Sequence, residues 1–537
     1  MKQTDPESII TIMDILSLRA KHTPGSLAYS IEGESITYGR LLDEVLRTAM
    51  ALADSGLKKG SRCALILPTG HDFIRLIYAI QSLGAVPTAV NPGLTPELIL
   101  RRMQIIKCNL AVASGSTLEN LKTAMRLESA PPTVKSPEEI RCSSTYAIPF
   151  PSKANLNDTA FLQFTSGTTG DTKAAVITHQ NLMAHLRVTA DFMGIKEGDI
   201  FVGWLPLYHD LGLVQFVFAP LYSGCLAYLI QPSILNLQKW LETISRERGT
   251  VTACPDFGYR IAARIINPQG LDLSALRIAK NGGEPVRFST IELFERRFGL
   301  SGVVRPAYGL AEATLSVTCL APGEPLRVDA RGNLSCGLPY GNTEIKIVDR
   351  KSKRLSPGET GEILVRGPQI FAGYFGDERA TRQSLKNGWL HTGDLGTLDK
   401  DGHLYIFGRK RALIKRAGAM VIPREIEELA DSVNGVRFSA AVGFNPEGWG
   451  TEEVIVIAEV QRNHEKTIAD LETIARNIMD KIKKGIGFSP FEIVLVSYRT
   501  IPRTPNGKIQ YDKLRLLYAT GDLARQGVIL YGKTGIN

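Results

Sequence analysis

A loop rich in glycine and hydroxyl side chains is the part of the sequence best suited to chemistry. The apolar run Phe161–Phe164 leads into six small or hydroxyl residues, Thr165–Gly170, and the segment closes with Lys173. Glycines let backbone amides approach an anion closely, hydroxyls add hydrogen-bond donors, and the lysine adds positive charge. The spacing does not fit a Walker A loop, because G-x-x-x-x-G-K-[ST] cannot be aligned with it. The composition favours a phosphate-binding loop over the alternative, a flexible surface loop.

This loop is the first of five segments that together resemble one family. Thr-Ser-Gly-Thr-Thr-Gly-x-x-Lys (165–173) is similar to the phosphate loop of the adenylate-forming superfamily, which includes acyl-CoA synthetases, nonribosomal-peptide adenylation domains and luciferases. The other four follow in the family's order: Tyr308–Thr314, Trp389–Asp394, Gly408–Gly418 and Arg503–Ile509. The resemblance covers essentially the whole chain.

The resemblance implies a role for individual residues. The residues expected to hold the ATP phosphates are Thr165, Ser166, Gly167, Thr168, Thr169, Gly170 and Lys173, and Thr168 is also expected to act in catalysis. Tyr308, with Gly309, is expected at the adenine. Glu312 is expected to hold Mg²⁺ and to act in catalysis, and Asp394 is expected to bind the ribose hydroxyls. As a single residue, Asp394 after a Thr-Gly turn is also compatible with a helix N-cap.

The C-terminal motifs imply a mobile domain that brings in the catalytic lysine. Arg409, Lys415 and Gly418 lie in the segment that resembles the joint between two domains and are expected to contact the cofactors. Lys508 lies in the segment that resembles the catalytic-lysine motif. Alone, a lysine after a Pro-Asn-Gly turn is more often a surface residue. The chemistry fits the assignment, because activating a carboxylate with ATP brings two anions together and needs cations where charge develops. Mg²⁺ prefers carboxylate and phosphate oxygens.

Two positions depart from the family pattern. The loop reads Gly-Asp-Thr-Lys-Ala (170–174), where relatives often have Gly-x-Pro-Lys-Gly. The lysine and the donor-rich half remain, so we expect activity to be retained. Arg411 stands where relatives often have aspartate or lysine, and a polar hinge residue is still serviceable there.

Two further segments resemble fatty acyl-AMP ligases and related long-chain enzymes. Trp204–Leu213 contains His209, expected at the mouth of the acyl pocket and among the catalytic residues, although a structural histidine capping a strand end is the alternative. Asn281–Pro285 is expected to form the adenine-binding turn, which assigns nucleotide contacts to Gly283, Glu284 and Pro285. The apolar residues Phe216, Val217, Phe218 and Leu221 suit an uncharged tail. Asp256 is left unassigned.

The connector Phe375–Gly388 is too short for the insertion that restrains the small domain in strict fatty acyl-AMP ligases. Rotation to a thioester-forming pose is therefore expected. The resemblance implies ATP-dependent activation of a fatty or other hydrophobic carboxylic acid to an acyl-adenylate, with Mg²⁺. The acyl group is then expected to pass to coenzyme A or to the phosphopantetheine of an acyl carrier protein. The alternatives are an amide synthetase, a noncatalytic adenylate- or lipid-binding homologue and, more distantly, a luciferase-like monooxygenase.

The elements that must position these residues follow from periodicity. Helix-like and strand-like patterns alternate over the first 150 residues, for example helical Leu41–Leu52 and strand-like Cys63–Leu67, which favours an α/β fold. Short strands at Glu344–Val348 and Glu362–Val365 predict a β-rich subdomain. Near Gly408 the pattern changes to a small α+β unit, with helices expected at 423–433 and 467–484. We therefore predict domains 1–408 and 409–537.

Composition excludes several other classes of protein. The chain has 537 residues, 44% of them hydrophobic and 22% charged, which is ordinary for a globular protein. No apolar run is long enough to span a membrane, and the first 24 residues lack the pattern of a signal peptide. Seven scattered cysteines favour free thiols, hence a cytoplasmic protein. The net charge of +9 is mild for this length and does not predict nucleic-acid binding.

Overall fold

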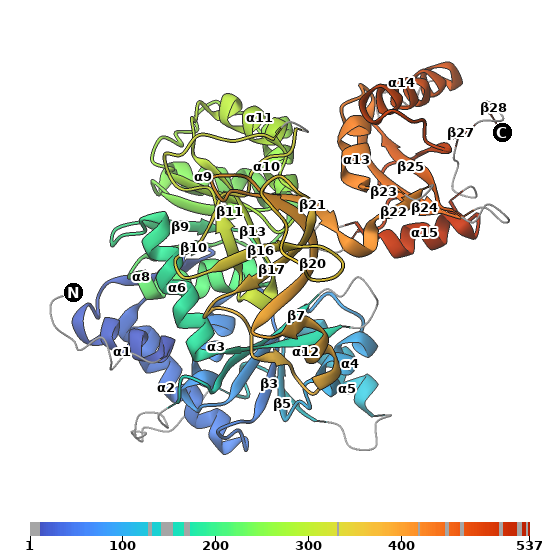
Figure 1. Ribbon diagram of the computed structural model, residues 1–537. Coiled ribbons are helices and arrows are strands. Elements are labelled where there is room, and N and C mark those ends of the chain that lie inside the picture. The colour runs from blue at the N-terminus through green and yellow to red at the C-terminus, as the bar shows by residue number, and fades with distance from the viewer. Residues whose placement is uncertain are drawn as a thin grey trace.

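The computed structural model describes residues 11–126, 132–140, 154–165, 172–329, 332–416, 419–445, 451–461, 467–503, 509–523, 529–532 and 535–536. Two large, mainly parallel sheets with helices on their faces make up the N-terminal part (Figure 1). The predicted α/β class is confirmed in this arrangement.

The first sheet has nine strands in the order β15-β14-β13-β12-β11-β9-β10-β1-β2. Its strands are β1 (Leu27–Ile31), β2 (Glu34–Thr37), β9 (Ile200–Gly203), β10 (Leu226–Leu229), β11 (Val251–Cys254), β12 (Ile278–Asn281), β13 (Val304–Gly309), β14 (Ser316–Cys319) and β15 (Leu338–Pro339). The neighbours β9, β11, β12 and β13 run parallel, so their carboxyl ends meet at one edge. In such sheets, ligands bind in the crevice outside that edge.

The second sheet has seven strands in the order β18-β8-β7-β4-β3-β5-β6. They are β3 (Arg62–Ile66), β4 (Val86–Ala89), β5 (Leu110–Ala113), β6 (Thr133–Lys135), β7 (Thr159–Thr165), β8 (Lys173–Thr178) and β18 (Gly373–Tyr374). The central strands β3, β4 and β5 are almost fully buried, as expected for parallel strands covered on both faces. β7 and β8 form an antiparallel pair in which Thr165 lies opposite Lys173, so the two ends of the predicted phosphate loop are neighbours.

Amphipathic helices cover these sheets. They are α1 (Ile12–His22), α2 (Tyr38–Asp54), α3 (His71–Ser82), α4 (Pro96–Ile105), α5 (Gly115–Met125), α6 (His179–Met193), α8 (Ala219–Ser223), α9 (Leu237–Arg246), α10 (Asp256–Ile265) and α11 (Phe288–Phe298). α6 begins with a capping box between Thr178 and Asn181. The Asn181 amide also donates to the carbonyl oxygens of Pro368 and Ile370, which ties this helix to the chain leading to β18.

A separate antiparallel sheet forms the predicted β-rich subdomain. Its strands are β16 (Glu344–Val348), β17 (Gly361–Arg366), β19 (Leu385–Lys386), β20 (Trp389–Leu398) and β21 (Leu404–Arg409). The residues between Tyr374 and β20 form the short helix α12 (Glu378–Ser384) and β19, so the expected connector is a folded element. The predicted domain boundary after residue 408 falls at the end of β21 and stays a prediction.

The C-terminal α+β unit lies to one side of the molecule, at the orange and red end of the chain (Figure 1). Its elements are the hairpin β22 (Ile414–Arg416) and β23 (Ala419–Val421), the sheet β24 (Val436–Phe444), β25 (Glu453–Val460), β26 (Glu492–Val496), β27 (Ile529–Gly532) and β28 (Gly535–Ile536), and helices α13 (Pro423–Asp431), α14 (Ile468–Ile486) and α15 (Tyr511–Ala519). The apolar faces of α13 and α14 pack on one side of this sheet. A second cluster that includes Leu514 packs on the other.

Charged contacts join this unit to the large one. The Arg287 guanidinium, at the start of α11, lies 2.9 Å from an Asp431 oxygen on α13 and 3.5 Å from Asp256 on α10. Arg424 on α13 donates to the carbonyl oxygens of Ile406 and Val286. The two units therefore meet through a few directional contacts and one small apolar cluster, in which Tyr405 and Phe407 of β21 pack with Ile422. Among the described helices, none is both long and apolar enough to cross a bilayer.

The buried carboxyl of Glu427 predicts how the stability of the C-terminal unit depends on pH. It accepts hydrogen bonds from the Ala441 amide and the Tyr511 hydroxyl, but burial raises its pKa from 4.5 to about 7. A raised carboxyl pKa means that the folded state favours the protonated form. The stabilisation is therefore complete below about pH 4.5 and is lost as the pH rises through 7.

We expect Glu427→Gln to match the wild type near pH 5 and to be more stable by on the order of 2 kcal/mol near pH 8. Calorimetric melting of the full chain between pH 5 and 8 measures this difference. Asp480→Asn, at an exposed position of α14, is the matched control and should show no such trend. A Glu427→Gln curve parallel to that of the wild type would contradict the assignment.

Candidate active site

A polar cavity of about 570 Å³ lies where the ends of the two sheets meet the β-rich subdomain. We call it the nucleotide cavity. The predicted site residues that line it are Thr165, Lys173, His209, Gly283, Tyr308, Gly309, Glu312 and Arg409. They come from β7, β8, the loop after β9, the turn after β12, β13 with the turn that follows it, and β21. The structure thus brings together residues that are up to 244 positions apart.

Glu312 is held by an aromatic side chain that also faces a cation. The Tyr374 hydroxyl donates to its Oε1 at 2.7 Å, and the Lys173 Nζ lies 5.0 Å from the centre of the Tyr374 ring. Burial and the Glu312 charge together raise the pKa of Tyr374, so this hydroxyl stays protonated and donating. Among the described residues, no hydrogen bond reaches the other carboxylate oxygen. That oxygen is available to a cation bound with the phosphates.

Asp394 is almost fully buried and has both oxygens engaged. The Tyr308 hydroxyl donates to Oδ2 at 2.6 Å, and the Arg409 Nε lies 2.7 Å from Oδ1. Arg409 also donates to the Thr392 carbonyl oxygen, and the negative Asp394 raises the pKa of Arg409. Asp394 itself is not among the residues that line the cavity, but its carboxylate is fixed directly behind Tyr308 and Arg409, which do line it. From there it can accept hydrogen bonds from a polyol.

Close backbone packing forms the floor beneath these groups. A Cβ at Gly309 would lie 1.8 Å from the Leu315 carbonyl oxygen, and one at Gly282 would lie 2.8 Å from the Ala307 carbonyl oxygen. A larger residue at Gly309 would push β13 away from Leu315, and one at Gly282 would push the turn after β12 away from β13.

The cavity also contains two polar atoms that lack a hydrogen-bond partner in the described part of the chain. Among the described residues, the Gln163 Oε1 and the Lys280 Nζ are buried without a hydrogen bond. Burial lowers the pKa of Lys280 to about 8. Unsatisfied buried polar atoms of this kind are costly, so their presence fits a cavity that takes a polar ligand.

His209 occupies the junction with a second cavity. It is the N-cap of the short helix α7 (Asp210–Leu213), where its Nδ1 accepts from the Leu211 amide at 3.4 Å and lies beside Asp210. His209 therefore does act as a structural cap, as the alternative interpretation expected, but it caps a helix and not a strand. His209 nevertheless lines both cavities, together with Leu211 and Gly283.

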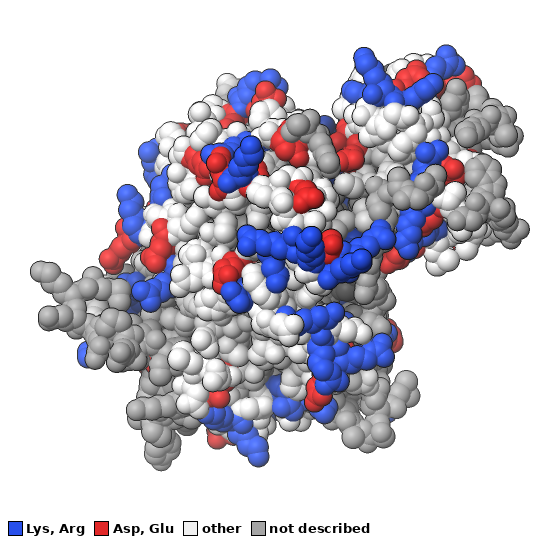
Figure 2. All heavy atoms as spheres, viewed as in Figure 1, with Lys and Arg blue, Asp and Glu red and all other residues white. Residues whose placement is uncertain are grey.

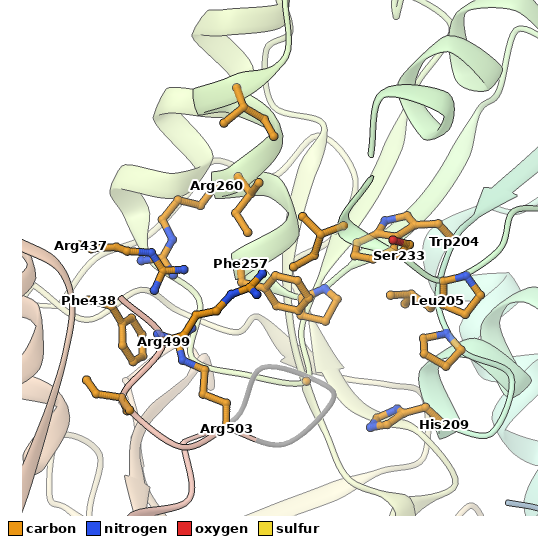
Figure 3. A pocket seen from close by; sticks show the side chains of 18 of the residues that line it. Trp204, Leu205, His209, Ser233, Phe257, Arg260, Arg437, Phe438, Arg499 and Arg503 are labelled. Carbon is orange, nitrogen blue, oxygen red and sulfur yellow. The ribbon is translucent and has the colours of Figure 1, made fainter. Parts of the chain in front are cut away.

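The second cavity, of about 720 Å³, is the acyl cavity (Figure 3). Trp204 and Leu205 lie on the His209 side of this cavity in Figure 3. The apolar part of its lining comes from Trp204, Leu205, Leu211, Ile234, Phe257 and Ile261. The side chains expected to suit the tail are elsewhere: Phe216, Val217, Phe218 and Leu221 are packed in the core of the large unit. These residues directly follow the Trp204–Leu213 motif in the sequence. In the structure they belong to the π-helical turn Val214–Phe218 and to α8, and their side chains are buried.

Glu284 and Pro285 do not line either cavity. The Glu284 carboxylate accepts from the Phe257 amide at the start of α10 and lies near Asp256, and burial together with that neighbouring charge raises its pKa. Asp256 is fully buried and accepts from Asn281, Thr290 and the Arg287 amide. Both acids hold helix ends together, which agrees with leaving Asp256 unassigned and separates Glu284 from its predicted neighbour Gly283.

Several predicted residues lie outside the described part of the chain: Ser166, Gly167, Thr168, Thr169, Gly170, Gly418 and Lys508. The residues on either side are described. Arg503 and Ile509 pair in an antiparallel bridge, and Arg503 lines the acyl cavity. Lys415 is exposed on β22, and β22 and β23 are the two strands that flank Gly418.

The residues of the nucleotide cavity can bind a hard metal ion only if a bound substrate supplies most of the oxygen atoms that coordinate the ion. Among the described residues, no group of three or more histidine, cysteine or acidic side chains could hold an ion. One carboxylate beside a lysine is the arrangement expected when Mg²⁺ arrives with phosphates. The site therefore fits such an ion through Glu312.

Sequence reasoning missed several residues of the nucleotide cavity, among them Gln163, Lys280, Thr392 and Tyr374. A signal existed for Lys280, a charged residue at the end of the buried apolar strand before Asn281. Tyr374 reaches Glu312 through the pairing of β18 with β8, and no local pattern shows that pairing.

Comparison with known proteins agrees with this geometry. Residues 16–375 match the family model described as AMP-binding enzyme. A medium-chain-fatty-acid–[acyl-carrier-protein] ligase of Moorena producens is 30% identical, with 96% of each chain covered. A 4-hydroxyphenylalkanoate adenylyltransferase of Mycobacterium tuberculosis is 27% identical, with 93% of this chain and 90% of that protein covered.

A solved structure from a study of fatty acyl-adenylate ligases of E. coli and L. pneumophila superimposes with a TM-score of 0.85. It is 26% identical, and the match covers 97% of this chain and all of the other. The expected fold and the expected class, a ligase, are confirmed by these matches. The chain belongs to the AMP-binding enzyme family.

Proposed function

We propose that this enzyme uses MgATP to convert a hydrophobic carboxylic acid into an acyl-adenylate and pyrophosphate, and then transfers the acyl group to a pantetheine thiol. The observation that carries the proposal is the junction of two unlike cavities at His209. The polar cavity suits a nucleotide and the largely apolar one suits an acyl chain. A carboxylate at the junction would lie beside both, which is the proximity that the reaction needs.

The nucleotide cavity offers a partner for each part of ATP. Asp394, fixed by Tyr308 and Arg409, accepts from the ribose hydroxyls, and Tyr308 borders the adenine. Lys173 and Thr165 stand at the two ends of the phosphate loop, and the hydroxyls between them, Thr168 included, belong to the same proposal. Glu312 holds Mg²⁺, whose contribution is to neutralise phosphate charge.

Lys508 is proposed to bridge the substrate carboxylate and the α-phosphate. The support is the position of the residues around it, because Arg503 lines the acyl cavity and pairs with Ile509. Such a cation acts only where negative charge develops, so its effect is on the transition state.

The acid is proposed to be a fatty or similarly hydrophobic one. The apolar wall of the acyl cavity and the names of the M. producens ligase and of the solved structure support this substrate class.

Phosphopantetheine, on a carrier protein or in coenzyme A, is the proposed acceptor. Lys415 on β22 is exposed and can attract an anionic partner. Its neighbours are partly neutralised within the chain, since Arg409 pairs with Asp394, Lys410 with Glu362 and Arg416 with Glu453. Elsewhere, Lys and Arg side chains gather in a band across the middle of the face shown in Figure 2. A carrier protein with an acidic surface fits this distribution of charge.

Intact-mass analysis of products tests the whole reaction. The enzyme is given ATP, Mg²⁺, a panel of acids, and either coenzyme A or a phosphopantetheinylated carrier protein. Acylation of a thiol together with acid-dependent pyrophosphate exchange is the expected result. Exchange without acylation of either thiol would favour the amide-forming alternative, and absence of exchange with every acid would favour the noncatalytic one.

Asp394→Asn tests the ribose site. The change removes the charge that Arg409 and the ribose hydroxyls share, so we expect KM for ATP to rise about tenfold or more, with a smaller change in kcat. Steady-state kinetics with varied ATP measures this. The control is Asp399→Asn, in the turn between β20 and β21, where the side chain only accepts from backbone amides and Tyr405. An equal change in the two variants would contradict the ribose role.

Lys508→Ala tests the separation of the two half-reactions. Loss of a cationic contact in the transition state should slow adenylate formation about a hundredfold or more. Thioester formation from synthetic acyl-adenylate should be almost unaffected, because that step no longer joins two anions. Lys513→Ala, an exposed lysine on α15, is the control. Equal loss of both half-reactions would rule out this role.

Gly418→Leu tests the path of the acceptor. A leucine side chain at residue 418, which follows β22 and precedes β23 in the sequence, should obstruct a pantetheine arm passing close to the backbone. We expect pyrophosphate exchange to be nearly intact and thioester formation to fall about tenfold or more. Met420→Leu on the same hairpin conserves volume and serves as the control. A variant that slows exchange and thioester formation equally would show that the hairpin does not form that path.

A further inference from the structure

The end of the acyl cavity away from His209 is lined by arginines (Figure 3). Figure 3 shows Arg260, Arg437, Arg499 and Arg503 there, and together with Arg264, which also lines the cavity, we call them the arginine cluster. One acid, Glu459, is the sole carboxylate among the described residues that line this cavity, and it is already paired with Arg437. A cavity whose near wall suits a hydrocarbon therefore ends in an excess of positive charge.

Most guanidinium groups of this cluster stack on aromatic rings and are not paired with carboxylates of the described residues. Arg503 and Arg260 lie over the Phe438 ring, 3.4 and 5.8 Å from its centre. Arg437 and Arg499 lie over the Tyr498 ring, at 4.3 and 5.1 Å. A stacked guanidinium has its face covered, while the N–H groups in its plane stay able to bind an anion in a two-point contact.

These donors have few partners inside the protein. In the described ranges, no acidic side chain forms an ion pair with Arg260, Arg264, Arg499 or Arg503, and the Arg503 Nη2 is buried without a hydrogen bond. Loss of water lowers the pKa of Arg503 to about 10 and also lowers that of Arg260. Burial of these two guanidinium groups is unfavourable unless an anion joins them, whereas Arg264 and Arg499 are exposed to solvent.

Backbone conformation points to the same part of the cavity. Arg499 has a φ of +69°, in the left-handed region that side-chain-bearing residues seldom adopt. Strained residues of this kind concentrate where a side chain must be presented to a ligand.

We propose that the arginine cluster binds a second anionic group at the far end of the acid substrate. The preferred substrates are then acids with a charged tail, such as α,ω-dicarboxylic acids, over methyl-terminated acids of equal length. This inference rests on the proposed function, because it takes the adenylated carboxylate to lie at His209.

The position of the cluster favours a substrate tail over a free anion. The cluster and His209 line one continuous cavity, so a single extended molecule can reach both. Arg260 and Arg264 belong to α10 of the large unit, whereas Arg437, Arg499 and Arg503 belong to the C-terminal unit. An anionic tail between them would therefore also draw the two units together while the adenylate forms.

Binding of stable acyl-adenylate analogues tests the proposal without turnover. The probes are acyl-sulfamoyl-adenosines with acyl chains from hexanoyl to dodecanoyl, each made with a methyl end and with a carboxylate end. Calorimetry on the full chain should show the carboxylate-ended probe of the best-fitting length binding about tenfold or more tighter than its methyl-ended partner. This advantage should shrink as salt is raised.

Two variants remove charge from the cluster. Arg260→Met keeps the aliphatic stem, and Arg499→Asn places a residue that tolerates positive φ. Each should weaken the carboxylate-ended probe about fivefold or more and leave the methyl-ended probe unchanged. Arg47→Met, at an exposed position of α2 far along the chain from the cavity, is the control and should change neither.

The remaining outcomes separate this inference from the proposed function. Equal binding of the two probe types, or equal weakening of both by the variants, would overturn the anionic-tail proposal and leave adenylation standing. If coenzyme A rather than the carboxylate-ended probe loses affinity in the variants, the cluster serves the acceptor and the proposal is wrong. If no probe of either type binds, the cavities do not hold an acyl-adenylate, and both proposals fall.

Discussion

The ion pair between Asp394 and Arg409 is the contact on which most of the architecture converges. Asp394 lies on β20 and Arg409 ends β21, the last strand before the C-terminal unit, while Tyr308 reaches the same carboxylate from β13 of the nine-stranded sheet. One buried charge thus joins the large sheet, the β-rich subdomain and the connection to the small unit. A ligand that binds Asp394 can therefore shift Arg409, which lies where the small unit begins.

A second set of charges fixes the small unit against the large one. Arg287 stands between Asp256 and Asp431, so its single positive charge is shared by acids from both units. Asp256 also accepts hydrogen bonds from Asn281 and Thr290. Asn281 directly precedes the turn after β12, which lines the nucleotide cavity. Apart from the small apolar cluster of Tyr405, Phe407 and Ile422, these contacts are made by charged groups and backbone carbonyl groups, which can be exchanged for water. A unit held in this way can be released without exposing a large apolar core.

The sequence predicted the elements well and the side-chain directions less well. Apolar runs such as Cys63–Leu67 and the helical period of Leu41–Leu52 are local signals, and the structure has β3 and α2 at those places. The motif residues Thr165, Lys173, Tyr308, Glu312, Asp394 and Arg409 were found because their types and order carry the family pattern. Glu284 shares a motif with Gly283, but the turn reverses its direction, and that reversal depends on Phe257 and Asp256 far away in the sequence. Phe216–Phe218 were misplaced because an apolar run suits a pocket and a core equally.

The same limit explains why the arginine cluster has no counterpart in the sequence pattern. Its members come from one helix and from three separate places in the C-terminal unit, and only the contact between the units brings them to one cavity. Phe438 and Tyr498, which hold them, look like ordinary core or surface aromatic residues when taken singly. Because the far wall of the acyl cavity belongs to the C-terminal unit, the shape and charge that the acid meets depend on where that unit lies. Substrate selection and domain position are thus coupled by the geometry of one cavity.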